Sequence, residues 1–261
     1  MTATNLPKRS QPIVWFITGS SRGFGRVWTE AALARGDKVA ATARNPNALT
    51  TLVNTYGDAI LPLKLDVTNQ DAVFQAMNQA HQYFGRLDII LSNAGYGPLD
   101  AVEEVSLEDV RANFETNVFG TLSVIQAALP LLRKQGGGHI LPVTSIGGVV
   151  TFPTVGLYQA AKYAVEGMAE TLASESSTMP EYDAIRARMY TGFTPETYGD
   201  PAATSEAIFK VVDDEEPPLR LLLGSTSLPI IRKVYADRMA TWDKWADVSN
   251  AAQGNTSNVQ I

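Results

Sequence analysis

The chain has 261 residues, a net charge of −6 and no cysteine. These values exclude disulfides, thiolate catalysis and cysteine-ligated metals, and two histidines, His81 and His139, are too few for a histidine-rich metal site. An apolar content of 45% with 18% charged residues is typical of a globular protein. No basic cluster exceeds a pair such as Lys8-Arg9, so we expect neither nucleic acid nor an anionic membrane as a partner.

The N-terminal residues 1–12 are polar and lack the apolar core of a signal peptide. No run approaches the ~18 apolar residues that a membrane span requires. We therefore expect a cytoplasmic protein in which residues 1–12 are extended or disordered. The length predicts one domain over residues 1–261, with a first part at 13–175 and a second at 176–261.

The first apolar run, residues 13–18, predicts a buried parallel strand, and residues 26–35 have the spacing of a helix. A glycine-rich loop lies between them. Glycines in this context let the backbone approach a pyrophosphate, which the amides at the helix start then bind. A tight turn that merely needs glycine is the alternative. We expect a dinucleotide to contact the loop residues Gly19, Ser21, Arg22, Gly23, Phe24 and Gly25.

The second predicted strand, residues 38–43, runs into Arg44. A site that prefers NAD usually places an Asp or Glu here, against the ribose hydroxyls. Arg22 and Arg44 instead supply two guanidinium groups that suit a 2′-phosphate. The pair favours NADP(H) over NAD(H), and two solvent-exposed arginines are the alternative.

The rest of the N-terminal part alternates predicted helices and strands. Asp66 follows the third strand, where its carboxylate can meet an adenine amino group. We expect helices at 47–56, at 71–84 with Asn69 as N-cap and at 106–132 with Pro130 as a kink or end, and a helix that carries residues 158 and 162 and ends at about 174. We expect strands at 60–65, 87–91 and 139–144. This alternation predicts an α/β fold, a Rossmann-type doubly wound parallel sheet flanked by helices.

Tyr158 and Lys162 are four residues apart, so in a helix they share one face, separated by roughly 6 Å of rise. A cation fixed beside a phenol favours the ionised phenol and makes it a proton donor near neutrality. Tyr-x-x-x-Lys alone is common by chance. It becomes informative together with Ser145, thirteen residues upstream, just after a predicted strand.

Several motifs occur together and in order, from Thr18-Gly19-x-x-x-Gly23-x-Gly25 to Tyr158-x-x-x-Lys162, and the set resembles the short-chain dehydrogenase/reductase family in its single-domain form. The resemblance implies an NADP-preferring oxidoreductase that acts on a fairly apolar ketone, aldehyde or secondary alcohol and is often dimeric or tetrameric. It also implies cofactor contacts from Asp66, Val67, Asn93, Ala94, Gly95, Tyr158 and Lys162, and a catalytic set of Asn117, Ser145, Tyr158 and Lys162. In that set Tyr158 is the general acid/base, Ser145 donates a hydrogen bond to the substrate oxygen, and Asn117 holds a water next to Lys162.

The chain departs from the family pattern after the helix that carries Tyr158. Relatives continue with a sixth parallel strand, Pro-Gly and a substrate loop, whereas residues 174–183 lack an apolar β-branched run. Either residues 185–190 form a degraded strand, or some thirty residues are absent. We favour the second interpretation, because a strand buried on both faces should not carry Arg186 and Arg188.

This departure leaves a second functional hypothesis open, a non-catalytic NADP-binding module that reports on redox state or serves as a scaffold. An epimerase or dehydratase of related fold fits less well, because such enzymes usually space the glycines differently. A serine hydrolase is excluded, because Ser145 is not within Gly-x-Ser-x-Gly. Tyr96, Phe152 and Leu157 are candidates for the substrate pocket, from their position alone.

Overall fold

The computed structural model describes residues 11–98, 101–176, 216, 222, 225 and 227–253. The chain divides into two compact units, Met1–Ser177 and Thr178–Ile261. The predictions for residues 1–10 and for the degraded strand at 185–190 lie outside the described residues. That the two parts form a single domain stays a prediction.

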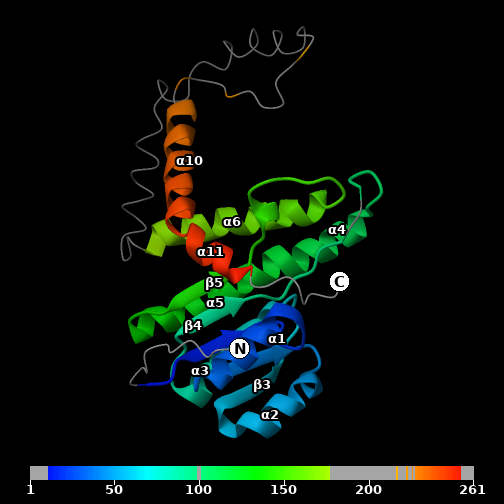
Figure 1. Ribbon diagram of the computed structural model, residues 1–261. Helices are drawn as coiled ribbons and strands as arrows, with labels where there is room; N and C mark the ends of the chain where they lie inside the picture. Colours follow the sequence, from blue (N-terminus) through cyan, green and yellow to red (C-terminus); the bar gives the residue numbers. More distant parts are fainter. Residues whose placement is uncertain are drawn as a thin grey trace. The chain divides into compact units, whose positions relative to one another are not determined.

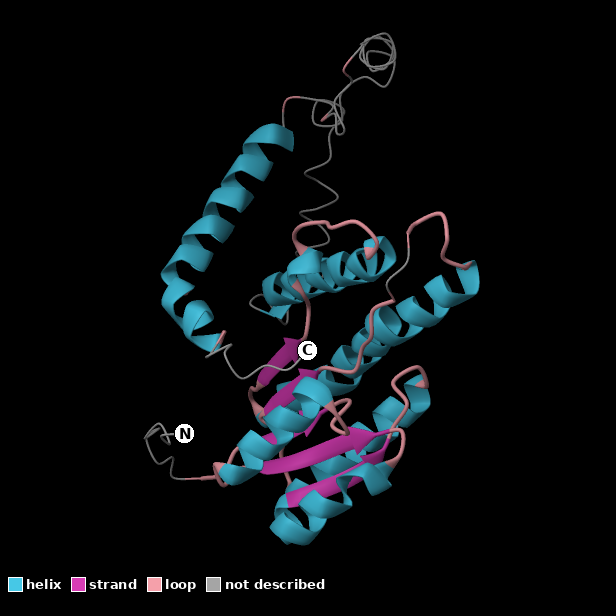
Figure 2. Ribbon diagram, turned by 45° about the vertical axis from the view of Figure 1, so that its right-hand side comes forward, coloured by secondary structure: helices cyan, strands magenta, loops and turns pink. Residues whose placement is uncertain are grey.

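The first unit contains a five-stranded parallel sheet in the order β3-β2-β1-β4-β5 (Figures 1 and 2). This arrangement confirms the predicted Rossmann-type α/β fold. The strand order reverses between β1 and β4, which is where an open parallel sheet forms a crevice at the carboxyl ends of its strands. The strands are β1 (Val14–Ile17), β2 (Lys38–Ala43), β3 (Ile60–Lys64), β4 (Ile89–Ser92) and β5 (His139–Pro142).

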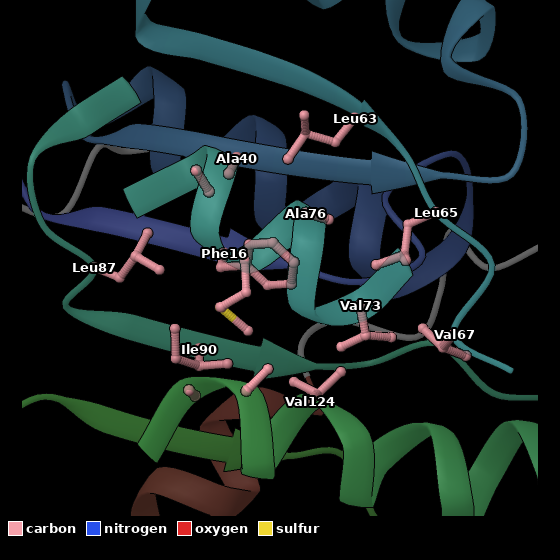
Figure 3. Close-up of a cluster of buried hydrophobic side chains, with 14 of the residues drawn as sticks. Phe16, Ala40, Leu63, Leu65, Val67, Val73, Ala76, Leu87, Ile90 and Val124 are labelled. Atoms are coloured by element: carbon pink, nitrogen blue, oxygen red, sulfur yellow. The ribbon is translucent and has the colours of Figure 1, made fainter. Parts of the chain in front are cut away.

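Two apolar clusters cover the two faces of this sheet. Phe16 of β1 and Ile90 of β4 pack against α3 (Gln70–Phe84) and α5 (Gly120–Gln135), as Figure 3 shows. Ile17 and Leu91, the next residue in each strand, point to the opposite face and pack in the cluster of α1 (Gly23–Ala34), η1 (Pro46–Leu49) and α2 (Thr50–Tyr56). A short 3₁₀ turn, η2 (Gly57–Ala59), leads into β3. Strands that alternate apolar residues on both faces must be covered on both sides, and here they are.

Two carboxylates hold the start of β1. Asp37 accepts hydrogen bonds from the Ile13 amide at 3.1 Å and from the Trp15 indole at 2.9 Å, and Asp88 accepts one from the Val14 amide at 2.9 Å. Asp37 is 5% exposed, and burial alone would raise its pKa. Hydrogen bonds from Arg35, Trp15 and Ile13 outweigh that effect and hold the pKa below the ordinary value.

The helix expected at 106–132 is divided, which corrects its predicted extent. It consists of α4 (Leu107–Phe114), a π-helical turn η3 (Glu115–Phe119) and α5, which continues through Pro130 to Gln135. The irregular turn therefore lies at Asn117 and not at the proline. Ser106 caps α4 by accepting the Asp109 amide at 3.0 Å, and Asn69 caps α3 by accepting the Ala72 amide at 2.9 Å, as predicted.

The last helix of the first unit, α6 (Gly156–Ser176), packs against η3 and against η4 (Ile146–Gly148). It thereby places Tyr158 and Lys162 next to the turn that carries Asn117. The second unit contains α10 (Ser227–Lys244) and α11 (Ala246–Ala252), with an ion pair of 2.5 Å between Lys233 and Asp237 on α10. No helix in the described ranges is both long and apolar enough to span a membrane.

Candidate active site

The glycine loop lies where β1 ends and α1 begins. Gly19 and Gly23 have φ of +71° and +58°, in the region that favours glycine. A Cβ on Gly25 would lie 2.3 Å from the Gly19 carbonyl oxygen, so a side chain cannot fit there. The side chain of the N-cap residue, Arg22, makes no capping hydrogen bond to α1, so its first amides are available to an external acceptor. The helix begins at Gly23, earlier than predicted, because the loop itself forms its first turn.

The ends of β1 and β4 are fastened together under this loop. The Thr18 hydroxyl accepts the amides of Asn93 and Ala94, each at 2.9 Å, and the Asn93 side chain donates back to the Thr18 carbonyl at 2.9 Å. Thr18 is fully buried. The side chain of Asn93 thus stabilises the backbone at the start of the glycine loop.

A second set of predicted residues lies at the ends of β2 and β3. Arg22 and Arg44 are both exposed, and among the described residues no carboxylate pairs with either. Asp66 accepts hydrogen bonds from the amide and hydroxyl of Thr68 at 3.1 and 2.9 Å. Val67 is buried against Gly120, where a Cβ would approach it to 2.8 Å.

Lys162 and Tyr158 lie on one face of α6, as their spacing predicted. The Lys162 ammonium lies 5.6 Å from the centre of the Tyr158 ring and donates to the Val143 carbonyl oxygen at 2.7 Å. Lys162 is 6% exposed, whereas Tyr158 is half-buried. Burial lowers the pKa of the Lys162 ammonium below its ordinary value. The pair places a cation of fixed position beside a phenol that reaches the surface.

Asn117 lies behind this pair, in the π-helical turn. Its amide nitrogen donates to the carbonyl oxygens of Tyr96 and Asn113, at 2.9 and 3.1 Å. Its Oδ1 is buried and has no partner among the described residues. A Cβ on Gly95 would lie 2.4 Å from that oxygen and 3.7 Å from the Lys162 ammonium. The carboxamide oxygen and the ammonium therefore face the same small space.

Ser145 is the N-cap residue of η4 and follows the short loop that leaves β5. Its hydroxyl oxygen accepts the Gly147 amide at 3.1 Å, which leaves its hydrogen free to donate. The Gly147 backbone also packs on Gln159, the residue next to Tyr158. Gln159 is 2% exposed, and neither end of its carboxamide has a partner among the described residues.

A cleft of about 930 Å³ joins most of these groups. Of the predicted site residues it is lined by Gly19, Ser21, Arg22, Gly23, Phe24, Arg44, Asp66, Val67, Asn93, Ala94, Gly95, Tyr158 and Lys162. Three are not at its wall: Gly25 and Asn117 are buried behind it, and Ser145 follows the lining residue Thr144. Of the guesses for a substrate pocket, Tyr96 lines the cleft, and Phe152 and Leu157 do not.

Two residues of this region were not predicted from the sequence. Gly97 packs closely on the Tyr158 ring. A Cβ at this position would lie 2.9 Å from two ring carbons, so only glycine fits without a shift of the ring. Asn113 is fully buried and donates to the Tyr96 carbonyl oxygen at 2.9 Å. Each has a signal in the sequence. Gly97 is a second glycine two residues after Gly95, and Asn113 is a second asparagine one helical turn before Asn117. In the described part of the chain no cluster of His, Asp and Glu could hold a metal ion.

Comparison with known proteins assigns the architecture to a family. A family model described as short chain dehydrogenase matches residues 13–186. The chain is 38% identical over 270 positions to "Oxidoreductase BOA17" of Botryotinia fuckeliana, an alignment that covers 92% of this chain and 98% of that protein.

Solved structures agree with this assignment. A short-chain dehydrogenase from Streptomyces avermitilis is 31% identical with a TM-score of 0.62, over 93% of this chain and 99% of the other. A short chain dehydrogenase/reductase from Burkholderia phymatum in complex with NAD and ElxO with NADP bound are each 30% identical with TM-scores of 0.60. They cover 63% of this chain and 60% and 68% of their own.

Proposed function

The chain belongs to the short-chain dehydrogenase/reductase family of oxidoreductases, and from that premise we propose that it transfers a hydride between NADP(H) and a ketone, aldehyde or secondary alcohol. One observation carries the proposal. The buried Lys162 ammonium is held 5.6 Å from the Tyr158 ring, in a cleft that the glycine loop also lines. A proton donor and a phosphate cradle in one cleft are what such a reaction needs.

The residues present fit a nicotinamide dinucleotide. Gly25 cannot carry a side chain, and the uncapped start of α1 offers amides to a diphosphate. Asp66 and Val67 would hold the adenine, Asn93, Ala94 and Gly95 the middle of the molecule, and Lys162 the nicotinamide ribose. When bound, the nicotinamide supplies or accepts the hydride.

Tyr158 provides the proton in the reducing direction. Its phenol donates to the substrate oxygen as negative charge develops there, and Lys162 stabilises the phenolate that is left. Ser145 donates a second hydrogen bond to the same oxygen. Its hydroxyl is ready for this, because the Gly147 amide already occupies a lone pair. In the oxidising direction Tyr158 accepts the proton instead.

Asn117 would supply the path by which Tyr158 regains its proton. Its Oδ1 has no partner among the described residues and faces the same space as the Lys162 ammonium, and both residues are buried. A buried polar atom without a partner costs roughly 1–3 kcal/mol, so a water between the two groups would be stabilising. Such a water would connect Lys162 with solvent.

The preference for NADP(H) rests on Arg22 and Arg44. Both line the cleft, both are exposed, and no acidic residue stands at the end of β2 to meet the ribose hydroxyls. A guanidinium pairs with a phosphate through charge-assisted hydrogen bonds, which are about twice as strong as neutral ones. The half-exposed Tyr96 at the cleft supports an apolar substrate.

The test is an assay of NADPH and NADH oxidation by the purified chain, with a panel of apolar ketones and aldehydes, beside a direct measurement of cofactor binding by fluorescence. We expect turnover with at least one carbonyl, faster with NADPH. NADPH binding without turnover on the whole panel would instead support the non-catalytic module. A dimer or tetramer in solution is also proposed, and light scattering measures it.

A further inference from the structure

The carbonyl group of Tyr96 is held by two buried side chains. The amides of Asn113, in α4, and Asn117, in η3, each donate to its oxygen at 2.9 Å. A carbonyl oxygen has two lone pairs, so these donors satisfy it fully. Asn113 is 0% and Asn117 1% exposed, which means that solvent does not replace either bond.

The residues on both sides of Tyr96 lie close to the proposed proton donor and its cation. Gly97 packs on the Tyr158 ring, where a Cβ would lie 2.9 Å from Cγ and Cδ2. The Cβ position of Gly95 lies 3.7 Å from the Lys162 ammonium. A shift of the Tyr96 carbonyl therefore moves the backbone against which Tyr158 rests.

We propose that Asn113 is a positioning residue, which acts through the Tyr96 carbonyl and Gly97 to fix the Tyr158 ring relative to Lys162. The proposal rests on the proposed function of Tyr158 as the proton donor. It adds a residue outside the Asn117, Ser145, Tyr158 and Lys162 set.

The two asparagines have different tasks in this arrangement. Asn117 has a second bond, to the Asn113 carbonyl oxygen, and its Oδ1 faces Lys162. The amide of Asn113 donates to the Tyr96 oxygen, and its own Oδ1 is buried with no partner among the described residues. The two hydrogen bonds that Asn113 and Asn117 donate to the Tyr96 oxygen form a clamp on this carbonyl group. Replacing Asn113 with leucine, which has a similar shape, removes one bond of the clamp and also the buried Oδ1. The fold loses little, while the strip at residues 95–97 loses one of its two anchors.

The experiment compares the wild-type chain, Asn113→Leu and Thr121→Val. Thr121 accepts a buried hydrogen bond from Ser92 at 3.3 Å in the adjoining α5, so Thr121→Val also removes a buried bond but leaves the clamp intact. We expect Asn113→Leu to lower kcat about tenfold, to change the NADPH dissociation constant less than about twofold, and to unfold near the wild-type temperature. Thr121→Val should keep the wild-type kcat.

A second measurement does not depend on turnover. NMR signals of the Tyr158 ring, assigned by their loss in Tyr158→Phe, report the surroundings of the ring at constant pH. Asn113→Leu should shift these signals, because the ring is held less well against Gly97 and beside Lys162, and Thr121→Val should leave them in place. Unchanged ring signals and kcat in Asn113→Leu would overturn the proposal, as would an equal loss of kcat in Thr121→Val. Should Asn113→Leu fail to fold, Asn113→Ala replaces it, since it removes the donor without adding a charge. Shifted ring signals in a chain that reduces no carbonyl would support the positioning role and contradict the proposed function.

Discussion

The Lys162 ammonium donates a hydrogen bond of 2.7 Å to the carbonyl oxygen of Val143, the first residue after β5. This bond ties α6 to the sheet at the point where the chain leaves β5 for Ser145. It also fixes the cation while leaving it almost without solvent, at 6% exposure. The lysine is thus held beside the Tyr158 ring, at a cost in desolvation.

That cost predicts a pH dependence of stability. Burial lowers the pKa of Lys162 in the folded chain below its ordinary value of 10.5, so between the two values the unfolded chain binds more protons. The contribution of Lys162 to the free energy of unfolding therefore rises with pH across this window. Lys162→Met lacks this desolvation cost, so its stability gain over the wild type should be largest near neutral pH. We expect that gain in unfolding free energy to fall as pH rises toward 10.5, as measured by urea denaturation. The exposed Lys134→Met is the control and should show no such trend.

The lowered pKa of Asp37 predicts a second pH dependence of stability, in the acidic range. Its pKa is held below the ordinary 3.8, so the stability that it provides is fully present above that value and is lost as pH falls through the folded pKa. Asp37→Asn should lower the free energy of unfolding by roughly 1–3 kcal/mol at pH 7, because Asn lacks the charge that holds Arg35. The deficit should shrink in acid. A deficit that is constant from pH 7 to pH 3 would show that the charge of Asp37 contributes nothing.

Gly97→Ala tests the contact with the Tyr158 ring. The added methyl group would lie 2.9 Å from two ring carbons, so the ring must move. We expect kcat to fall about tenfold or more, with little change in NADPH affinity. Gly167→Ala, on the exposed side of α6 with nothing near its Cβ position, is the matched control and should be slightly more stable than wild type. Equal kcat values in the two variants would contradict the role of Gly97.

Gln159→Met tests the energetic cost of burying a carboxamide without hydrogen-bond partners. Both polar atoms of this side chain lack partners in the described part of the chain, and methionine has nearly the same shape. Removing an unsatisfied buried amide should raise the free energy of unfolding by about 1 kcal/mol. A lower unfolding temperature for Gln159→Met would show that the carboxamide has a partner.

The cofactor preference is tested by Arg22→Ala and Arg44→Ala. Each should weaken NADPH binding about tenfold or more, since each removes a charged partner of the 2′-phosphate. NADH binding by the same variants is the internal control and should change little. If the binding of NADPH and of NADH weakens equally, the arginines do not recognise the 2′-phosphate.

The sequence predicted the sheet and the glycine loop between β1 and α1 because their signals are local. Apolar runs such as residues 13–18 mark buried strands, and glycines between a strand and a helix mark a phosphate loop. The fixed spacing of Tyr158 and Lys162 on a helix placed them together without any tertiary information.

What the sequence did not predict depends on contacts between distant segments. The π-helical turn at Asn117 forms where two asparagine amides reach the Tyr96 carbonyl, and no periodicity in residues 106–132 signals it. Gly97 matters only because Tyr158, sixty-one positions later, packs on it.

Residues 177–215 lie outside the described part of the chain, so the choice between a degraded strand and a deletion stays a prediction. The alignment with "Oxidoreductase BOA17" spans 270 positions, more than the 261 residues of this chain, so that protein contains residues without a counterpart here.

The central claim is that the Tyr158 phenol transfers the proton, and Tyr158→Phe tests it most directly. The substitution removes one oxygen and keeps the ring on which Gly97 packs. With a carbonyl that the wild-type chain reduces, we expect kcat to fall about 10²–10⁴-fold and the NADPH dissociation constant to stay within about twofold. A kcat near the wild-type value, with NADPH bound normally, would contradict the account.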